Sequence, residues 1–243
     1  MGTYRLDLAY DGSRFRGWAR QPGLRTVQGE LEDALARVLG EPVGLTVAGR
    51  TDAGVHALAQ VASFDLYREP PPALARALNA LTGPDLTVTG LAAAPGFDAR
   101  RGARSRRYRY RVETRSPPSP FERGRALHWP YELDAEALDA CAGLLPGTHD
   151  FTAFTPTETE HVRFERNVLD AGWRADGEGI LAFEIEADAF LRNMVRVLVG
   201  TMLEVGGGRR DRDGFRRLLG GAPRSDAGPT APPHGLYLIA VRY

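Results

Sequence analysis

Residues 43–64 have the sequence VGLTVAGRTDAGVHALAQVASF, which indicates both a local fold and a candidate functional site. Its two ends, 43–47 and 59–64, alternate apolar with other residues, a pattern that predicts two strands. The loop between them, 48–57, carries two glycines and four reactive or polar side chains: Arg50, Thr51, Asp52 and His56. Charged residues on a glycine-bearing loop held by strands indicate a functional site. A tight turn with a solvated Arg50–Asp52 pair is the alternative.

A second feature is the density of arginine in residues 100–115. Eight arginines and one glutamate give this segment a net charge of +7, although the whole chain is neutral, with 31 basic and 31 acidic residues. Repulsion at that density lowers stability unless an anionic partner relieves it. Within 107–112 arginine alternates with tyrosine or valine, which predicts a strand with one apolar and one cationic face. The cationic face suits contact with nucleic acid. An edge strand with its arginines in water is the alternative.

A third feature is Arg196, which lies in an apolar segment. Val195, Leu198 and Val199 share a helical face there, and Arg192 and Arg196 are spaced to project together from a helix. An arginine among apolar neighbours costs free energy unless an anion pairs with it. The segment therefore fits a clamp on a buried carboxylate, and the exposed flank of an amphipathic helix is the alternative.

The remaining pattern predicts two similar halves, 1–104 and 105–243, joined near the proline-rich segment 115–120. Strands are predicted at 4–10, 86–89, 167–174, 180–187 and 236–243, and helices between Thr26 and Gly40, over 74–81, 134–145 and 191–205, and around 215–219. We expect an α+β fold in which two α/β halves with mostly antiparallel sheets join into one extended mixed sheet with a central cleft.

Composition excludes several classes of protein. Cys141 is the only cysteine, so no disulfide framework forms within the chain, and its place on an apolar helical face predicts a core residue. The N-terminus lacks the apolar core of a signal peptide, and no run approaches the ~20 apolar residues of a membrane span, so a cytoplasmic protein is expected. The five histidines are scattered without metal-ligand spacing, and we expect no metal site.

Together these motifs resemble the tRNA pseudouridine synthase A family, and the resemblance runs nearly end to end. The loop at 49–56 is the most specific motif, and the strand at 106–110 is similar to the family's aromatic and basic strand. The other matching segments follow in the family's order and lie at 10–13, 17–18, 147–151, 194–196, 228–232 and 235–238.

The resemblance implies an enzyme of the pseudouridine synthase fold that isomerises uridine to pseudouridine in the anticodon stem-loop of tRNA, at tRNA positions 38–40, as a homodimer and without a cofactor. Asp52 is then the essential carboxylate, Tyr108 stacks on the target base, and Arg50 and Arg196 steer the RNA and Asp52. Thr51 and His56 complete the expected substrate-binding set. The expected RNA-binding residues around the cleft are Arg104, Arg106, Arg107, Arg109 and Arg111.

The chemistry fits the residues independently. Pseudouridylation breaks the bond between N1 and C1′ and remakes it at C5, which needs one carboxylate as nucleophile or base and no redox partner. Two alternatives stay open. A hydrolase of N-glycosidic bonds in RNA could also use Asp52, but a retaining glycosidase needs a second carboxylate about 5 Å away, and the motif holds none. A non-catalytic RNA-binding module would use only the surface of 100–115.

Overall fold

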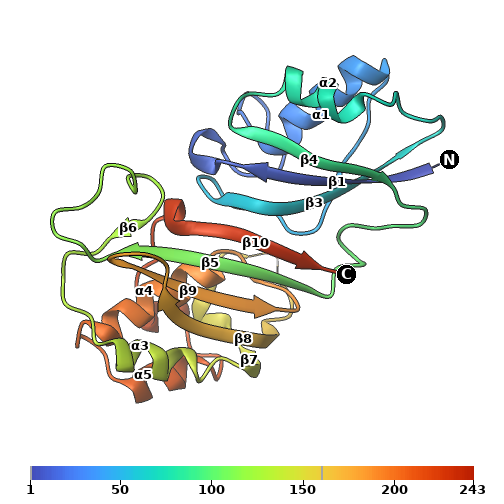
Figure 1. The fold of residues 1–243 in the computed structure, drawn as a ribbon. Coiled ribbons are helices and arrows are strands. Elements are labelled where there is room, and N and C mark those ends of the chain that lie inside the picture. Colours follow the sequence, from blue (N-terminus) through green and yellow to red (C-terminus); the bar gives the residue numbers. More distant parts are fainter. Residues whose placement is uncertain (1, 160) are drawn as a thin grey trace. The chain divides into compact units, whose positions relative to one another are not determined.

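The computed structural model describes residues 2–159 and 161–243, and the chain divides into two compact units (Figure 1). Unit 1 comprises the residues up to Arg106 together with Tyr237–Tyr243, and unit 2 comprises Arg107–Leu236. The halves predicted from the sequence are 1–104 and 105–243, whereas in the structure Tyr237–Tyr243 belong to unit 1. The physical reason is a parallel pairing in which Tyr237 lies opposite His56.

Unit 1 is a sheet with two helices on one face (Figure 1). The strand order is β4-β1-β3-β10, and the short β2 also pairs with β3. The strands are β1 (Gly2–Tyr10), β2 (Thr46–Val47), β3 (His56–Leu66), β4 (Leu86–Ala93) and β10 (Leu236–Arg242). β1 is antiparallel to both β3 and β4, whereas β10 runs parallel to β3. The alternate burial of Tyr4, Leu6, Leu8 and Tyr10 on β1 confirms the predicted core-facing side of that strand.

The first helix, α1 (Val27–Leu39), has the ends that its sequence predicted. The Thr26 hydroxyl accepts a hydrogen bond from the backbone N–H of Gly29 at 3.3 Å, and Gly40 ends the helix with φ 75°. The second helix, α2 (Leu74–Leu81), also lies where it was expected.

The predicted strand at 43–47 is shorter than expected, because only Thr46 and Val47 pair with β3. The backbone N–H of Leu45 instead donates to the Glu32 carboxylate at 3.1 Å, so a side chain of α1 takes the place of a neighbouring strand.

Unit 2 repeats the plan of a sheet with helices on one face (Figure 1). Its strand order is β5-β9-β8-β7, and β6 runs parallel to β5. The strands are β5 (Ser105–Glu113, in this unit from Arg107), β6 (Leu127–His128), β7 (Gly147–Asp150), β8 (Glu165–Ala175) and β9 (Ile180–Ala187). The helices are α3 (Ala135–Ala142), α4 (Met194–Gly206) and α5 (Arg212–Leu218), and they pack against one another.

Helix α4 forms the centre of the core of unit 2, since Val197, Leu198, Val199 and Met202 are fully buried. It begins at Met194, preceded by Asn193 with φ 62°. Arg192 therefore lies outside the helix, and the prediction that Arg192 and Arg196 project together from one helical face is wrong. Four short 3-10 turns, η1 (Gly12–Arg14), η2 (Thr152–Phe154), η3 (Arg224–Asp226) and η4 (Pro233–Gly235), complete the described elements.

The predicted α+β class with mixed, mostly antiparallel sheets is confirmed. The predicted cleft stays a prediction. Among the described residues, no helix has both the length and the apolar character needed to cross a bilayer.

Gly200→Ala should destabilise the protein. Gly200 lies on α4, where an added Cβ would sit 1.9 Å from the carbonyl oxygen of Pro229. Such overpacking costs about 1–3 kcal/mol of the free energy of unfolding, which denaturant titration measures. The matched control is Gly172→Ala on β8, where nothing lies within 4 Å of the added carbon. Equal stabilities of the two variants would contradict the close packing at Gly200.

Candidate active site

The loop that carries Asp52 is fixed in unit 1 by backbone hydrogen bonds to the segment that follows β1. The N–H of Trp18 donates to the carbonyl of Thr51 at 3.0 Å, and the N–H of Gly54 donates to the carbonyl of Phe15 at 3.2 Å. A third bond, from Val55 N–H to the Asp52 carbonyl at 3.2 Å, closes the turn of the loop itself. The Asp52 backbone is therefore held in one conformation.

Two glycines make this close approach possible. An added Cβ at Gly12 would lie 2.0 Å from the carbonyl oxygen of Val55, where no side chain fits. Gly17 has φ 98°, and its added Cβ would lie 3.0 Å from the Thr51 carbonyl oxygen. The two segments pack backbone to backbone, which explains why glycine stands at both positions.

A buried polar network supports the loop from below. The hydroxyls of Tyr10 and Thr51 lie 2.8 Å apart, and the Gln60 amide donates to the Tyr10 hydroxyl at 3.2 Å and to the Gly49 carbonyl at 2.8 Å. Burial raises the pKa of Tyr10 to about 12, so its phenol stays protonated at neutral pH. Thr51, which was predicted to bind substrate, uses its hydroxyl within this network and is 6% exposed.

His56 is the first residue of β3 and is also buried. Its Nδ1 lies 3.1 Å from the backbone N of Gly12 and 3.2 Å from a carboxylate oxygen of Asp11. Its ring stacks on Tyr237 of β10, with centroids 4.6 Å apart. The imidazole thus joins three segments of unit 1, whereas Arg50 on the same loop is exposed and Asp52 is partly buried.

Arg106, which was predicted to bind RNA, is engaged with the backbone of unit 1. Its Nε and Nη2 donate to the carbonyl of Ala48 at 3.0 and 2.6 Å, and Nη1 donates to the carbonyl of Ala103 at 3.0 Å. Ala48 is the first residue of the loop 48–57, so the guanidinium holds the start of that loop. Arg104, by contrast, is exposed, and its side chain has no ion pair with any other described residue.

In unit 2 the structure describes Tyr108 and Arg196, each with its own neighbours. Tyr108 is 7% exposed and packs edge to face on Phe190, with centroids 5.0 Å apart. Arg196 donates from Nε to the carbonyl of Ala231 at 2.7 Å and from Nη1 to the Asn193 side chain at 3.0 Å. Asn193 was not among the residues predicted from the sequence, where its only signal is a residue type that tolerates positive φ ahead of a helix.

The cationic face of β5 is paired with acidic side chains of its own unit. The predicted alternation is confirmed, because the arginines are partly exposed while the tyrosines and valine between them are buried. The pairs, at N–O distances of 2.5–3.3 Å, are Arg107 with Asp170 and Glu184, Arg109 with Glu184 and Asp176, and Arg111 with Asp176 and Glu122. The protein thus supplies anionic partners for these arginines itself. The RNA-binding role that the sequence predicted for these three arginines is untested, and these ion pairs favour a role within the protein instead.

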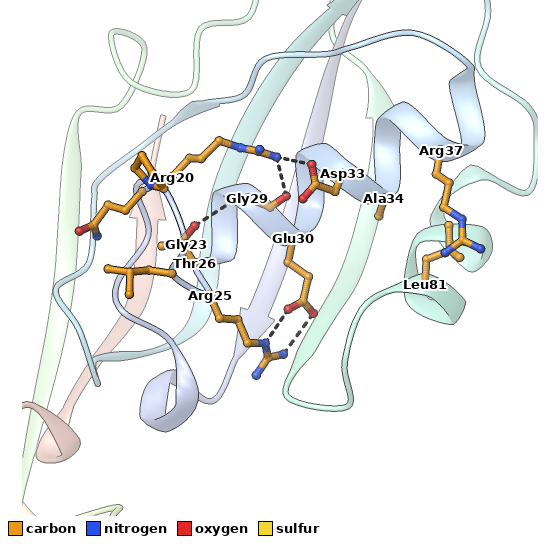
Figure 2. A pocket seen from close by; sticks show the side chains of 13 residues that line it. Arg20, Gly23, Arg25, Thr26, Gly29, Glu30, Asp33, Ala34, Arg37 and Leu81 are labelled. Atoms are coloured by element: carbon orange, nitrogen blue, oxygen red, sulfur yellow. Dashed lines mark hydrogen bonds and ion pairs between the residues drawn. The ribbon is translucent and has the colours of Figure 1, made fainter.

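A groove beside the start of α1 contains none of the predicted site residues (Figure 2). Four of its charged residues are in ion pairs, since Arg25 binds Glu30 and Asp85 while Arg20 binds Asp33. Within 2–159 and 161–243, no group of histidine, cysteine or acidic residues could hold a metal ion.

Comparison with known proteins identifies the family. A family model described as tRNA pseudouridine synthase matches residues 8–99 and 141–243. The chain belongs to the tRNA pseudouridine synthase family. The resemblance seen in the sequence is confirmed, and the matched residues include Asp52 and Arg196. Tyr108 and the arginines of β5 lie in the unmatched segment.

Curated relatives agree over nearly the whole chain. Proteins called tRNA pseudouridine synthase A are 49% identical in Frankia casuarinae, over 98% of this chain and 88% of the relative, and 42% identical in Myxococcus xanthus, over 100% and 92%. The one from Lacticaseibacillus casei is 42% identical over the full length of both chains. A solved Cbf5-Nop10-Gar1 complex matches with 10% identity and a TM-score of 0.34, over 83% of this chain and 54% of that chain, a likeness too remote to support an inference.

Single replacements of arginine should separate contacts with RNA from contacts within the protein. Arg104→Ala should lower the salt dependence of tRNA binding by about one phosphate contact, roughly 0.7–0.9 log units per log unit of salt. Arg109→Ala should leave that slope unchanged and reduce the free energy of unfolding by about 1–3 kcal/mol, because the buried Glu184 loses a partner. Binding titrations over a salt series and denaturant unfolding measure the two effects. The reverse pattern would place Arg109, not Arg104, against the RNA.

Proposed function

We propose that this chain converts uridine to pseudouridine in the anticodon stem-loop of tRNA and that Asp52 supplies the reacting carboxylate. The observation that carries the proposal is the match of the tRNA pseudouridine synthase family over both units, with residues 49–56 inside it. The rigid seating of that loop supports the assignment. A reacting carboxylate must be held in place before the substrate arrives, because an error of about 1 Å can cost a factor of a hundred in rate.

The reaction is an isomerisation, so its atoms and electrons balance without a redox partner. The bond between N1 and C1′ breaks, the base turns, and a bond forms between C5 and C1′. The proton leaves C5 and N1 gains one, so the product has the composition of the substrate. Asp52 acts as nucleophile toward the nucleoside or as base toward its sugar, and either role requires the ionised carboxylate.

The other predicted residues take supporting roles. Extruding the target base from its stack costs a few kcal/mol, and stacking on Tyr108 returns about 1–3 kcal/mol of that cost. Arg50 is exposed and suits a phosphate contact, and Arg196 contacts the substrate. Thr51 and His56 are buried, so they serve the reaction by holding the Asp52 loop.

We also propose an oligomeric state, a cellular location and a cofactor requirement for the enzyme. The family resemblance supports a homodimer that binds one tRNA across both subunits, in the cytoplasm and without a nucleotide cofactor. Sedimentation of the free protein and of its tRNA complex tests the subunit composition.

Asp52→Asn should abolish pseudouridine formation while tRNA affinity and unfolding stability stay close to wild type. The amide has the shape of the carboxylate but is neither a nucleophile nor a base at neutral pH. Unmodified tRNA transcripts are incubated with each protein, and pseudouridine is mapped by carbodiimide-dependent stops of reverse transcription. Turnover by the variant, with deamidation excluded by mass spectrometry, would refute the assignment. Free uracil from the wild type would show a hydrolase, and binding without product would show an RNA-binding module.

Tyr108→Leu should lower turnover severely, whereas Tyr108→Phe separates two roles of the side chain. If the ring acts only by stacking, the phenylalanine variant keeps most of its activity. If the hydroxyl carries the C5 proton, that variant binds tRNA normally and turns over slowly. Initial rates at saturating tRNA measure the difference, and wild-type turnover by Tyr108→Leu would remove this residue from the site.

A further inference from the structure

Residues 228–235, here called the strap, lie directly against helix α4 in unit 2. The N–H of Gly228 donates to the Thr201 hydroxyl at 3.0 Å, and the N–H of Ala231 donates to the carbonyl of Arg196 at 3.1 Å. At Gly200 the helix and the strap are in backbone contact, because an added Cβ would lie 1.9 Å from a carbonyl oxygen of the strap. The strap and this side of α4 therefore form one rigid piece.

The guanidinium of Arg196 is fixed at two of its nitrogens. Nε donates to the carbonyl of Ala231 in the strap at 2.7 Å, and Nη1 donates to Oδ1 of Asn193 at 3.0 Å. A guanidinium is planar and its donors point in fixed directions, so two such bonds determine both its plane and its rotation.

Tyr110 holds the strap at the neighbouring carbonyl. Its side chain is fully buried, and its hydroxyl donates to the carbonyl of Pro232 at 2.8 Å. Burial raises the pKa of Tyr110, although the nearby charge of Arg196 opposes the rise, so the phenol keeps its proton at neutral pH. The ring packs where Gly235 leaves space, since an added Cβ there would lie 2.8 Å from it. The carbonyl that binds Arg196 Nε is thus next to one that Tyr110 anchors.

Asn193 is arranged in an unusual way for the residue that precedes a helix. Side chains at this position commonly accept a hydrogen bond from the first turn, but the Asn193 side chain makes no such bond. Its backbone has φ 62°, a left-handed conformation that asparagine tolerates better than most residues. The amide contacts Arg196 instead, which indicates that orienting the guanidinium takes precedence over capping the helix.

We propose that Tyr110 and Asn193 are positioning residues that set the orientation of Arg196, Tyr110 through the strap and Asn193 directly. This inference rests on the proposed function, in which Arg196 contacts the substrate. Neither residue touches the reacting atoms. Their loss makes the orientation of the guanidinium less precise, which slows the chemical step and leaves tRNA binding unchanged.

The test compares two variants that each remove one contact. Tyr110→Phe keeps the ring and deletes the hydroxyl, and Asn193→Gly deletes the amide in a residue that accepts positive φ. Rates of tritium release from C5-labelled uridine in tRNA give kcat and KM. We expect kcat to fall about tenfold in each variant, as for loss of one good hydrogen bond in the transition state, with KM unchanged. The control is Tyr243→Phe, which removes a hydroxyl bond to the Ala99 carbonyl in unit 1 and should keep wild-type kcat.

A double-mutant cycle tests whether the effect passes through Arg196. In an Arg196→Lys background the oriented guanidinium is absent, so adding Tyr110→Phe should lower kcat no further. If the two effects simply multiply, Tyr110 does not act through Arg196 and the inference is overturned. A fall in stability without a fall in kcat would likewise assign Tyr110 a structural role only.

A second readout does not depend on activity. In ¹⁵N-labelled protein the Nε–H of Arg196, identified by its loss in Arg196→Lys, should exchange slowly with water because it donates to a carbonyl. Exchange should be about tenfold faster in Tyr110→Phe and Asn193→Gly than in Tyr243→Phe. Equal exchange rates in all variants would overturn the inference. If the wild type forms no pseudouridine, the proposed function fails while this measurement still decides the orientation of Arg196.

Discussion

The constraint on which the candidate site depends is the contact between two backbone segments of unit 1, the turn after β1 and the loop that carries Asp52. At Gly12 the two chains approach so closely that an added Cβ would lie 2.0 Å from a carbonyl oxygen of the loop. Hydrogen bonds from Trp18 and to Phe15 then fix the loop along its length. Beneath it, Tyr10 and Thr51 satisfy each other's hydroxyls in a buried network. The Asp52 loop is therefore held by main-chain hydrogen bonds and by the buried side chains of Tyr10 and Thr51.

A second principle of the structure is the neutralisation of charge within the chain. The arginine-rich strand β5 looks in isolation like a surface for nucleic acid, but the acidic residues of β8, β9 and their connection pair with three of its arginines. Glu184 is nearly buried and binds Arg107, Arg109 and Arg174, so these charges depend on one another. The segment's net charge of +7 therefore overstates the positive charge that it presents to solvent, where Arg104 is exposed.

The sequence predicted those features that have local causes. Thr26 and Gly40 mark the ends of α1 because capping acts within one turn, and the alternation in β1 and β5 gives their buried faces directly. The Asp52 loop could be predicted as a candidate site because Arg50, Thr51 and Asp52 are consecutive in the sequence. Long-range partners could not be read in this way. No local pattern indicates that β10 joins unit 1, that Glu184 forms an ion pair with Arg109, or that the Glu32 carboxylate binds the N–H of Leu45. Each of these contacts joins segments that only folding brings together.

The position of β10 has a consequence for the newborn protein. The strand beside β3 is synthesised only after the whole of unit 2, so the N-terminal unit waits through most of synthesis for its parallel neighbour. During that interval the start of β3, at His56 and Ala57, lacks the strand that pairs with it, and an unpaired strand edge is a hazard for aggregation. The stack of Tyr237 on His56 is also missing, and with it one brace of the loop. Unit 1 thus stays incomplete until translation has passed Tyr237, which ties its maturation to the synthesis of unit 2.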